Sequence, residues 1–284
     1  MSFSRRSFLG GAAALGMAPA MPAADKLGFQ LGVTDWNLRL TGKVEAVALA
    51  KKIGFDGVEV SLGMQPVGDK LALANDEIQE KYLAAAKEQG IALAGTCLDI
   101  LHRNYLKNDK LGQKWVADGI PITKKLGAKV MLLPFFGKGA LETKAEKDYV
   151  GDALRELAPE AEKAGVLLGL ENTISAEDNV RIMERAGSKA LLVYYDVGNS
   201  TNGGFDVLKE IRWLGRDRIC QMHLKDNPYF LGEGRINFPA VLKAIHEIGF
   251  SRFANLETDC PTKDVAADMR RNSAYIRKVS ATIA

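Results

Sequence analysis

The sequence predicts an α/β protein that folds as a single (β/α)8 TIM barrel, and three observations support this. Eight short apolar runs, typical of strands covered on both faces, are spaced through residues 29–256. Amphipathic segments separate these runs, and seven of the runs follow a glycine of the kind that ends a helix. The 284 residues are the length of one such barrel. An open doubly wound sheet is the alternative, but no glycine-rich phosphate loop follows the first run.

The expected elements alternate regularly along the chain. The apolar runs predict strands at 29–33, 58–60, 91–93, 130–133, 166–170, 191–195, 219–222 and 253–256. The preceding glycines are Gly54, Gly90, Gly127, Gly165, Gly187, Gly215 and Gly249. Alanine-, lysine- and glutamate-rich segments predict helices at 76–89, 108–126, 145–164 and 264–279. Apolar residues at helical spacing predict a further helix over 238–248.

Residues 1–24 differ from the rest and predict an export signal. Ser4-Arg5-Arg6-Ser7-Phe8-Leu9 precedes a short apolar run and small residues that allow cleavage after Ala20, Ala23 or Ala24. The paired arginines resemble a twin-arginine signal, which implies transient contact with that export machinery and a periplasmic or secreted protein. The run is too short to span a bilayer, so we expect no stable membrane insertion. A simple N-terminal arm or short anchor is the alternative, and 25–284 form the barrel domain.

Charge and cysteine content exclude several classes of protein. The 38 basic and 35 acidic residues give a net charge of +3, which is too balanced to indicate a nucleic-acid partner. Cys97, Cys220 and Cys260 are odd in number, and each lies in or beside an apolar run. We therefore expect three buried, unpaired cysteines rather than a disulfide scaffold.

Polar residues follow the expected strands, where a barrel of this kind carries its active site. In chain order they are Asp35, Glu59, Cys97, Pro134, Glu171, Asp196, His223 and Glu257. Singly, such residues are often helix caps or core residues, but the last four close four consecutive apolar runs. Three carboxylates and one imidazole in a dry pocket would repel one another or neutralise without a cation. The four therefore predict a metal site, and mostly oxygen ligands favour Mn²⁺ or Mg²⁺ over a structural zinc.

Five short segments carry a resemblance to a known family. They are Leu170-Glu171-Asn172, Tyr195-Asp196-Val197-Gly198-Asn199, Met222-His223-Leu224-Lys225-Asp226-Asn227, Gly232-Glu233-Gly234-Arg235-Ile236-Asn237-Phe238 and Leu256-Glu257-Thr258. In order and strand context they resemble the xylose isomerase-like TIM-barrel superfamily of sugar phosphate isomerases and epimerases. The resemblance implies one divalent ion, Mn²⁺ before Mg²⁺, Co²⁺ or Zn²⁺, held by Glu171, Asp196, His223 and Glu257. It also implies that Glu171 and Glu257 are the acid/base pair, that the substrate is a sugar, and that a homo-oligomer is allowed.

The sequence departs from the family at Asn199, where a histidine is common in an Asp-x-x-His pattern after strand 6. Asparagine can form hydrogen bonds but cannot replace an imidazole base, so the exact substrate stays open. We expect Asn199, Lys225, Arg235, His102 and Trp36 to contact the substrate, with a surface or packing role as the alternative for the last four.

These residues predict an isomerase or epimerase of a keto-sugar or related polyol, which removes a proton next to a carbonyl and forms a metal-stabilised enediolate. A sugar lyase or dehydratase with the same site is one alternative. A non-catalytic, metal-anchored sugar-binding barrel is another. A DNA repair enzyme like endonuclease IV needs several histidines for three metals, and this chain has only three histidines.

Overall fold

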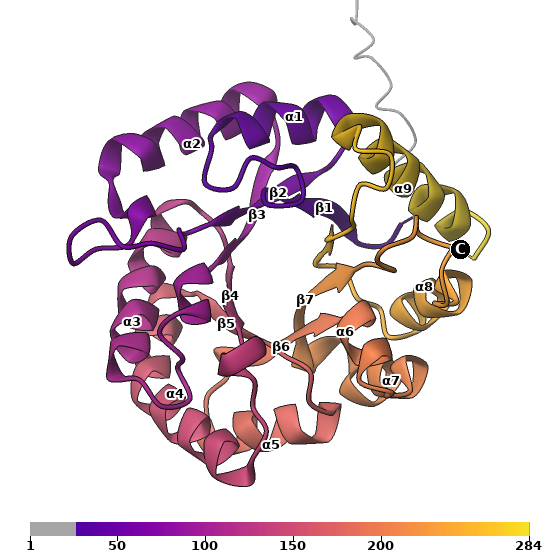
Figure 1. Cartoon of the computed structure of the whole chain (residues 1–284). Helices are drawn as coiled ribbons and strands as arrows, with labels where there is room; N and C mark the ends of the chain where they lie inside the picture. Colours follow the sequence, from indigo (N-terminus) through magenta and orange to yellow (C-terminus); the bar gives the residue numbers. More distant parts are fainter. Residues whose placement is uncertain (1–26, 284) are drawn as a thin grey trace, which may run out of the picture.

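The computed structural model describes residues 27–283 and contains a closed barrel of eight parallel strands (Figure 1). Neighbouring strands pair in sequence order, and β8 pairs with β1 to close the barrel. The strands are β1 (Gln30–Thr34), β2 (Gly57–Ser61), β3 (Ala92–Cys97), β4 (Val130–Pro134), β5 (Leu167–Glu171), β6 (Leu191–Asp196), β7 (Ile219–Leu224) and β8 (Phe253–Leu256). The predicted fold class, a single (β/α)8 barrel, is confirmed.

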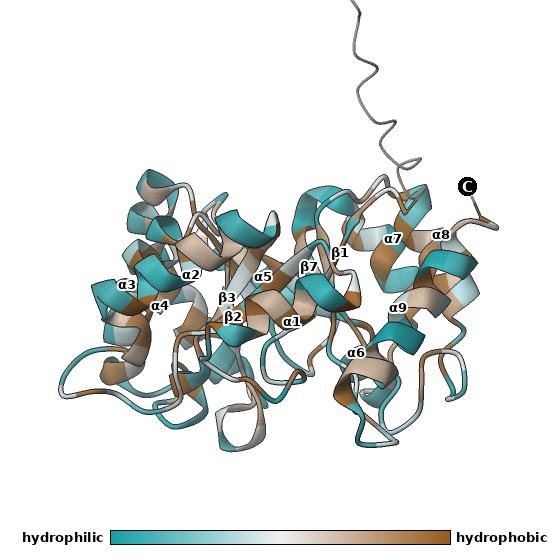
Figure 2. Ribbon diagram, turned by 90° about the horizontal axis from the view of Figure 1, so that it is seen from above, coloured by the Kyte–Doolittle hydropathy of each residue, from teal (hydrophilic) through white to brown (hydrophobic). Residues whose placement is uncertain are grey.

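A ring of helices covers the outside of the barrel (Figure 1). These are α1 (Glu45–Ile53), α2 (Asp76–Gln89), α3 (Lys110–Lys125), α4 (Lys144–Ala164), α5 (Ala176–Ala186), α6 (Val197–Asn202), α7 (Val207–Arg218), α8 (Phe238–Glu247) and α9 (Val265–Ser280). Short 3-10 turns lie after β2, β3 and β4, at Ala72–Ala74, Asp99–His102 and Gly137–Gly139. Helices such as α1 and α8 bury an apolar stripe against the barrel, and hydrophobic and hydrophilic residues alternate along the helices in Figure 2.

The glycines predicted to end helices all adopt positive φ angles. Gly54, Gly90, Gly165 and Gly187 are left-handed C-caps of α1, α2, α4 and α5. Gly215 differs, because it lies inside α7 at φ 64° and ψ 174°, where it interrupts the helix before a last short turn. The chain therefore leaves α7 without a left-handed cap and enters β7 directly.

Side chains from β7 and β8 occupy the barrel interior opposite glycines of β5 and β2, which lie two strands away around the barrel. A Cβ on Gly57 would lie 2.5 Å from the ring of Phe253, and one on Gly169 would lie 2.9 Å from Sγ of Cys220. Packing of this kind closes the barrel below its carboxyl-end mouth. The side view in Figure 2 shows long loops on the side of the barrel where α6 lies. The site described below is therefore built from strand ends and these loops.

Two further predictions concern the chain as a whole. Cys97, Cys220 and Cys260 are free and buried, as expected. In the part of the chain that the structure describes, no helix combines the length and apolar character needed to cross a membrane. The expected export signal at 1–24 lies outside the described residues.

Candidate metal centre and active site

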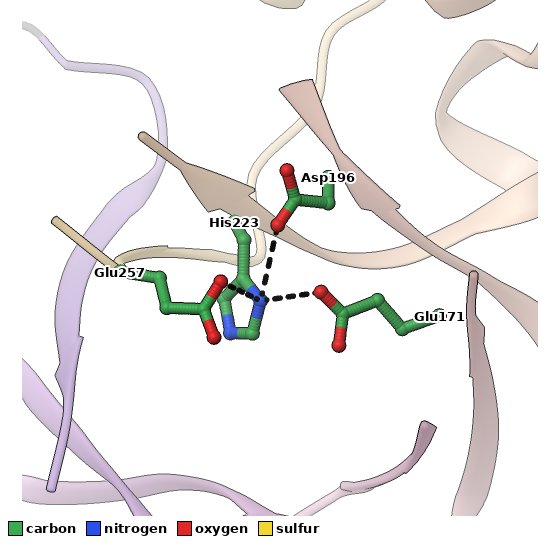
Figure 3. A group of neighbouring side chains, drawn as sticks. All are labelled: Glu171, Asp196, His223 and Glu257. Atoms are coloured by element: carbon green, nitrogen blue, oxygen red, sulfur yellow. Dashed lines mark hydrogen bonds and ion pairs between the residues drawn. The ribbon is translucent and has the colours of Figure 1, made fainter. Parts of the chain in front are cut away.

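Four polar side chains meet at the carboxyl-end mouth of the barrel (Figure 3). Nδ1 of His223 lies 3.0 Å from Oε1 of Glu171, 3.4 Å from Oε2 of Glu257 and 3.6 Å from Oδ2 of Asp196. One potential ligand atom from each residue lies within 4.8 Å of the other three. Glu171 and Asp196 end β5 and β6, His223 is the penultimate residue of β7, and Glu257 follows β8. The structure thus brings together the four residues predicted as metal ligands.

The segment after β6 fixes the carboxylate of Asp196. Asp196 is the N-cap of α6, and its Oδ1 accepts a 2.7 Å hydrogen bond from the backbone N–H of Asn199. Its other oxygen, Oδ2, is left to face His223 and lies 2.8 Å from Nζ of Lys225. A Cβ at Gly198 would lie 2.5 Å from Cγ of Lys225, so glycine is required for the lysine to pass this turn. The sequence Asp196-Val197-Gly198-Asn199 therefore orients the carboxylate of Asp196 and leaves room beside it for the ammonium group of Lys225.

A buried glutamate holds the other side of the imidazole. Oε2 of Glu59, in the middle of β2, lies 3.0 Å from Nε2 of His223, and neither side chain is exposed. The same oxygen accepts hydrogen bonds from the hydroxyl of Tyr194 at 2.8 Å and from Nδ2 of Asn255 at 3.3 Å. When Nε2 donates its proton to Glu59, the lone pair of Nδ1 is available to a metal ion between the carboxylates, which is the form of histidine that binds metals. Glu59 was noted in the sequence, but its place behind the histidine was not predicted.

The cluster is strongly acidic, and two basic groups balance it within the protein. Nζ of Lys225 lies 2.5 Å from Oε2 of Glu257 as well as 2.8 Å from Asp196. Burial raises the pKa of Asp196, but Lys225 and His223 outweigh it and bring that pKa below its usual value. Burial lowers the pKa of His223, whereas Glu257 and Glu171 raise it, so the net pKa shift is upward. Burial also raises the pKa of Glu171 well above the ordinary glutamate range.

This donor set fits a divalent cation. Three carboxylates and one imidazole nitrogen converge on a common point, and the residues from β5, β6 and β7 are buried. Taking such a concentration of negative charge out of water is costly unless a cation compensates it. Mostly oxygen donors with one nitrogen match Mn²⁺ and Mg²⁺ chemistry. The residues present therefore fit the metal expected from the sequence.

A cavity of about 330 Å³ opens above the cluster, with Glu171, Glu257 and Lys225 in its wall. Trp36 forms part of the apolar lining, and its Nε1 donates to Oε1 of Glu257 at 3.0 Å. His102 lies on the same wall, with its ring stacked on Phe136 at a centroid distance of 6.2 Å. A pocket of this size with apolar walls and a few convergent polar groups is typical of a small-molecule site.

The remaining predicted contact residues divide between two places. Asn199 lines the same cavity, and its Nδ2 donates to Oε1 of Glu171 at 3.3 Å. Arg235 does not line this cavity; it lies in a neighbouring one and contacts the side-chain oxygen of Asn202. Gly232-Glu233-Gly234 lies in the loop that connects β7 to α8.

Among the cavity residues that the sequence did not indicate, Asp99 carries an ionisable group. Asp99 begins the 3-10 turn after β3, lines the cavity and accepts a 2.6 Å hydrogen bond from the hydroxyl of Ser61. Burial raises its pKa to about 6. The only sequence signal was its place two residues beyond Cys97, at a strand end.

The fold and the site together define a (β/α)8 barrel with a carboxylate–imidazole metal centre at its mouth. A family model described as the xylose isomerase-like TIM barrel matches residues 47–279, and the chain belongs to that family. The resemblance stated from the sequence is thus confirmed.

Two curated relatives are epimerases. The chain is 27% identical over 205 residues to 2-epi-5-epi-valiolone 7-phosphate 2-epimerase of Actinoplanes sp., covering 70% of this chain and 73% of that protein. It is also 27% identical over 261 residues to L-ribulose-5-phosphate 3-epimerase UlaE of Escherichia coli, covering 82% and 88%.

Solved structures share the fold at lower sequence identity. A structure of L-ribulose 3-epimerase superposes with a TM-score of 0.74 at 18% identity, covering 90% of this chain and 95% of that one. The apo form of 3-keto-D-glucoside 4-epimerase from E. coli gives 0.70 at 19% identity, covering 88% and 99%. The IOLI protein, whose crystal structure is described with a binding zinc atom, gives 0.72 at 18% identity, covering 90% and 99%.

Proposed function

We propose that this chain is a metal-dependent epimerase or isomerase of a keto-sugar or related polyol. The observation that carries the proposal is the placement of two glutamates, Glu171 and Glu257, against one imidazole nitrogen in the wall of a sugar-sized cavity. Reactions that remove a proton next to a carbonyl and return it need such a pair of positioned acid/base groups. The two curated relatives, which are epimerases, support the same class.

Glu171, Asp196, His223 and Glu257 would hold the metal, and we favour Mn²⁺ because three of the four donors are carboxylates. A divalent cation there supplies positive charge that polarises a carbonyl oxygen and makes the neighbouring C–H bond more acidic. Glu59 keeps Nδ1 of His223 turned toward the cluster.

The two glutamates then move the proton. One carboxylate takes the proton from the carbon next to the carbonyl, the C–H electron pair becomes the C=C bond of an enediolate, and the carbonyl oxygen takes the displaced pair as negative charge. The other glutamate gives a proton to the opposite face of the same carbon and the oxygen's electron pair re-forms the C=O bond, which produces an epimer. If the proton goes instead to the former carbonyl carbon, and the hydroxyl proton moves from one oxygen to the other, an isomer forms. Glu171 is the more buried of the two glutamates, with 4% of its side chain exposed against 18% for Glu257, and this shielding from solvent suits it to hold the proton that is returned.

Solvent-deuterium incorporation tests this function most directly. Metal-loaded protein is incubated in D₂O with a panel of keto-sugars and oxidised glycosides, and exchange at the carbon next to the carbonyl is followed by NMR. Exchange followed by a changed stereocentre supports the epimerase. Exchange followed by loss of water or of an alcohol indicates a lyase or dehydratase, and binding without exchange indicates a sugar-binding barrel.

Glutamine variants test the roles of the two glutamates. Glu257→Gln and Glu171→Gln each keep an oxygen for the cation but cannot carry the proton, so turnover should fall by about 10²- to 10⁴-fold. The double variant should be little worse than the slower single variant, because the two residues act in one sequence of proton transfers. Glu247→Gln is the control, because Glu247 lies on the surface and pairs with Arg212. Unchanged turnover in both active-site variants contradicts the mechanism.

We also propose that residues 1–24 direct export by the twin-arginine route, a proposal that is supported by the sequence alone. Mass spectrometry of native material should find an N-terminus at or near residue 21, 24 or 25. A chain with Arg5→Lys and Arg6→Lys should stay inside the cell. An intact N-terminus on the native protein contradicts export, and a Lys-Lys chain that still crosses the membrane indicates the general secretion route.

A further inference from the structure

A second cavity, of about 440 Å³, lies beside the metal-site cavity. Asn199 and Lys225 line both cavities, so the two meet at these side chains. Lys225 also contacts two of the proposed metal ligands, Asp196 and Glu257. A ligand held at the metal site therefore has a second space next to it, reached past Asn199 and Lys225.

The second cavity is lined by groups that suit a sugar ring. Asn202 and Asn227 offer amide donors and acceptors, and Arg235 adds a guanidinium. Tyr229 lies in the same wall and is 55% exposed, one of few large apolar side chains so exposed in the described part of the chain. An aromatic face beside fixed amides is a surface on which a sugar can place its C–H groups while its hydroxyls form hydrogen bonds.

The charges of the second cavity disfavour a phosphate. Lys225 is already held by Asp196 and Glu257, so its charge is largely compensated. Asp226, only 4% exposed, places a carboxylate in the same wall, where its Oδ2 accepts a hydrogen bond from the backbone of Ile236. A phosphate dianion there would face this carboxylate, whereas a sugar hydroxyl can donate to it.

We infer that this second cavity, the Arg235 cavity, is a subsite for a further glycosyl unit, and that the substrate is a glycoside whose keto-sugar ring occupies the metal site. This inference rests on the proposed function and deepens it by naming the substrate class. In such a complex Asn199 and Lys225 lie at the junction of the two sugars, and Tyr229 and Arg235 contact the distal one.

Four probes that share one keto-sugar test the inference. They are D-fructose, fructose 6-phosphate, isomaltulose, which is fructose with a glucosyl group on O6, and lactulose, which is fructose with a galactosyl group on O4. Affinity for the metal-loaded protein is measured by calorimetry, and α-proton exchange is measured by NMR on the same samples.

We expect one of the disaccharides to bind about 10- to 100-fold more tightly than fructose, as an aromatic contact and a hydrogen bond to a charged group allow. Arg235→Ala and Tyr229→Ala should reduce the affinity for that disaccharide far more than the affinity for fructose. Trp213→Ala is the matched control, because Trp213 is also an exposed aromatic residue, at 43%, and lines neither cavity.

The outcomes separate the two proposals. Tighter, Arg235-dependent binding of a disaccharide without any α-proton exchange supports the subsite and contradicts the proposed function. Equal affinity for fructose and both disaccharides, or no binding of either disaccharide, overturns the subsite. Tightest binding of fructose 6-phosphate, lost in Arg235→Ala, overturns it in favour of a phosphate site.

Discussion

Replacing Glu59 by glutamine should weaken metal binding without removing any ligand. Oε2 of Glu59 accepts from His223 at 3.0 Å, from Tyr194 at 2.8 Å and from Asn255 at 3.3 Å, and its side chain is fully buried. A glutamine oxygen placed there keeps these three contacts but loses the negative charge that makes the histidine a stronger ligand. Loss of such a supporting partner typically costs about 10- to 100-fold in metal affinity. In free energy this is about 1.4 to 2.8 kcal/mol.

The assay is calorimetric titration of metal-free protein with Mn²⁺, with the metal-induced rise in melting temperature as a second measurement. Asp99→Asn is the matched control, because Asp99 is also a buried carboxylate near the mouth but its partner is Ser61. The Mn²⁺ dissociation constant of the Asp99→Asn variant should stay within about twofold of the native value. If Glu59→Gln binds Mn²⁺ as tightly as the native protein, the reasoning is refuted and His223 does not depend on Glu59 for its orientation.

Three further substitutions test the surroundings of the metal site. Lys225→Met removes the positive charge beside Asp196 and Glu257. The metal-free variant should therefore melt at a lower temperature, and calorimetry should show tighter Mn²⁺ binding. Both effects follow because charges about 4 Å apart interact by about 1 kcal/mol even in water. Gly198→Ala places a Cβ 2.5 Å from Cγ of Lys225 and should cost about 1–3 kcal/mol in urea unfolding; unchanged stability contradicts the close contact. Burial raises the pKa of Asp35 to about 8, so the folded state keeps a proton that the unfolded state releases, and stability should decline as pH rises from about 4 to about 8. Asp35→Asn should reduce that decline, which urea unfolding at the two ends of this range measures.

The sequence was sufficient for the barrel because each repeat carries its own signals. A strand that is covered on both faces can be predicted from its own apolar run, without knowing which strands pair with it. A glycine ends most of the preceding helices in a left-handed cap. The four predicted ligands could be found because parallel strands in a barrel end at one rim, so residues that close consecutive runs must converge. Glu171, Asp196 and His223 lie in consecutive strands, and Glu257 follows the last one.

The support behind the ligands could not be predicted in the same way. Glu59 reaches His223 from β2, across the barrel from β7, and this contact depends on the barrel closing between β8 and β1. The register of β2 against β3 also shifts between Val58 and Glu59. No local pattern encodes which inward residue of one strand meets a given residue on the far side. Arg235 was likewise expected at the substrate, but only the loop geometry places it in a separate cavity.

The unequal burial of the two glutamates gives the proposed mechanism a direction that can be measured. The side chain of Glu171 is 4% exposed and Glu257 is 18% exposed, so a proton on Glu257 is nearer to solvent. If Glu257 removes the α-proton, that proton should wash out into D₂O before it returns, and if Glu171 removes it, the proton should be retained longer. Glu171→Gln should then still exchange the α-proton of a bound keto-sugar with solvent while failing to form the epimer, and Glu257→Gln should do neither. The opposite pattern would assign proton removal to Glu171, because only the residue that breaks the C–H bond is needed for exchange.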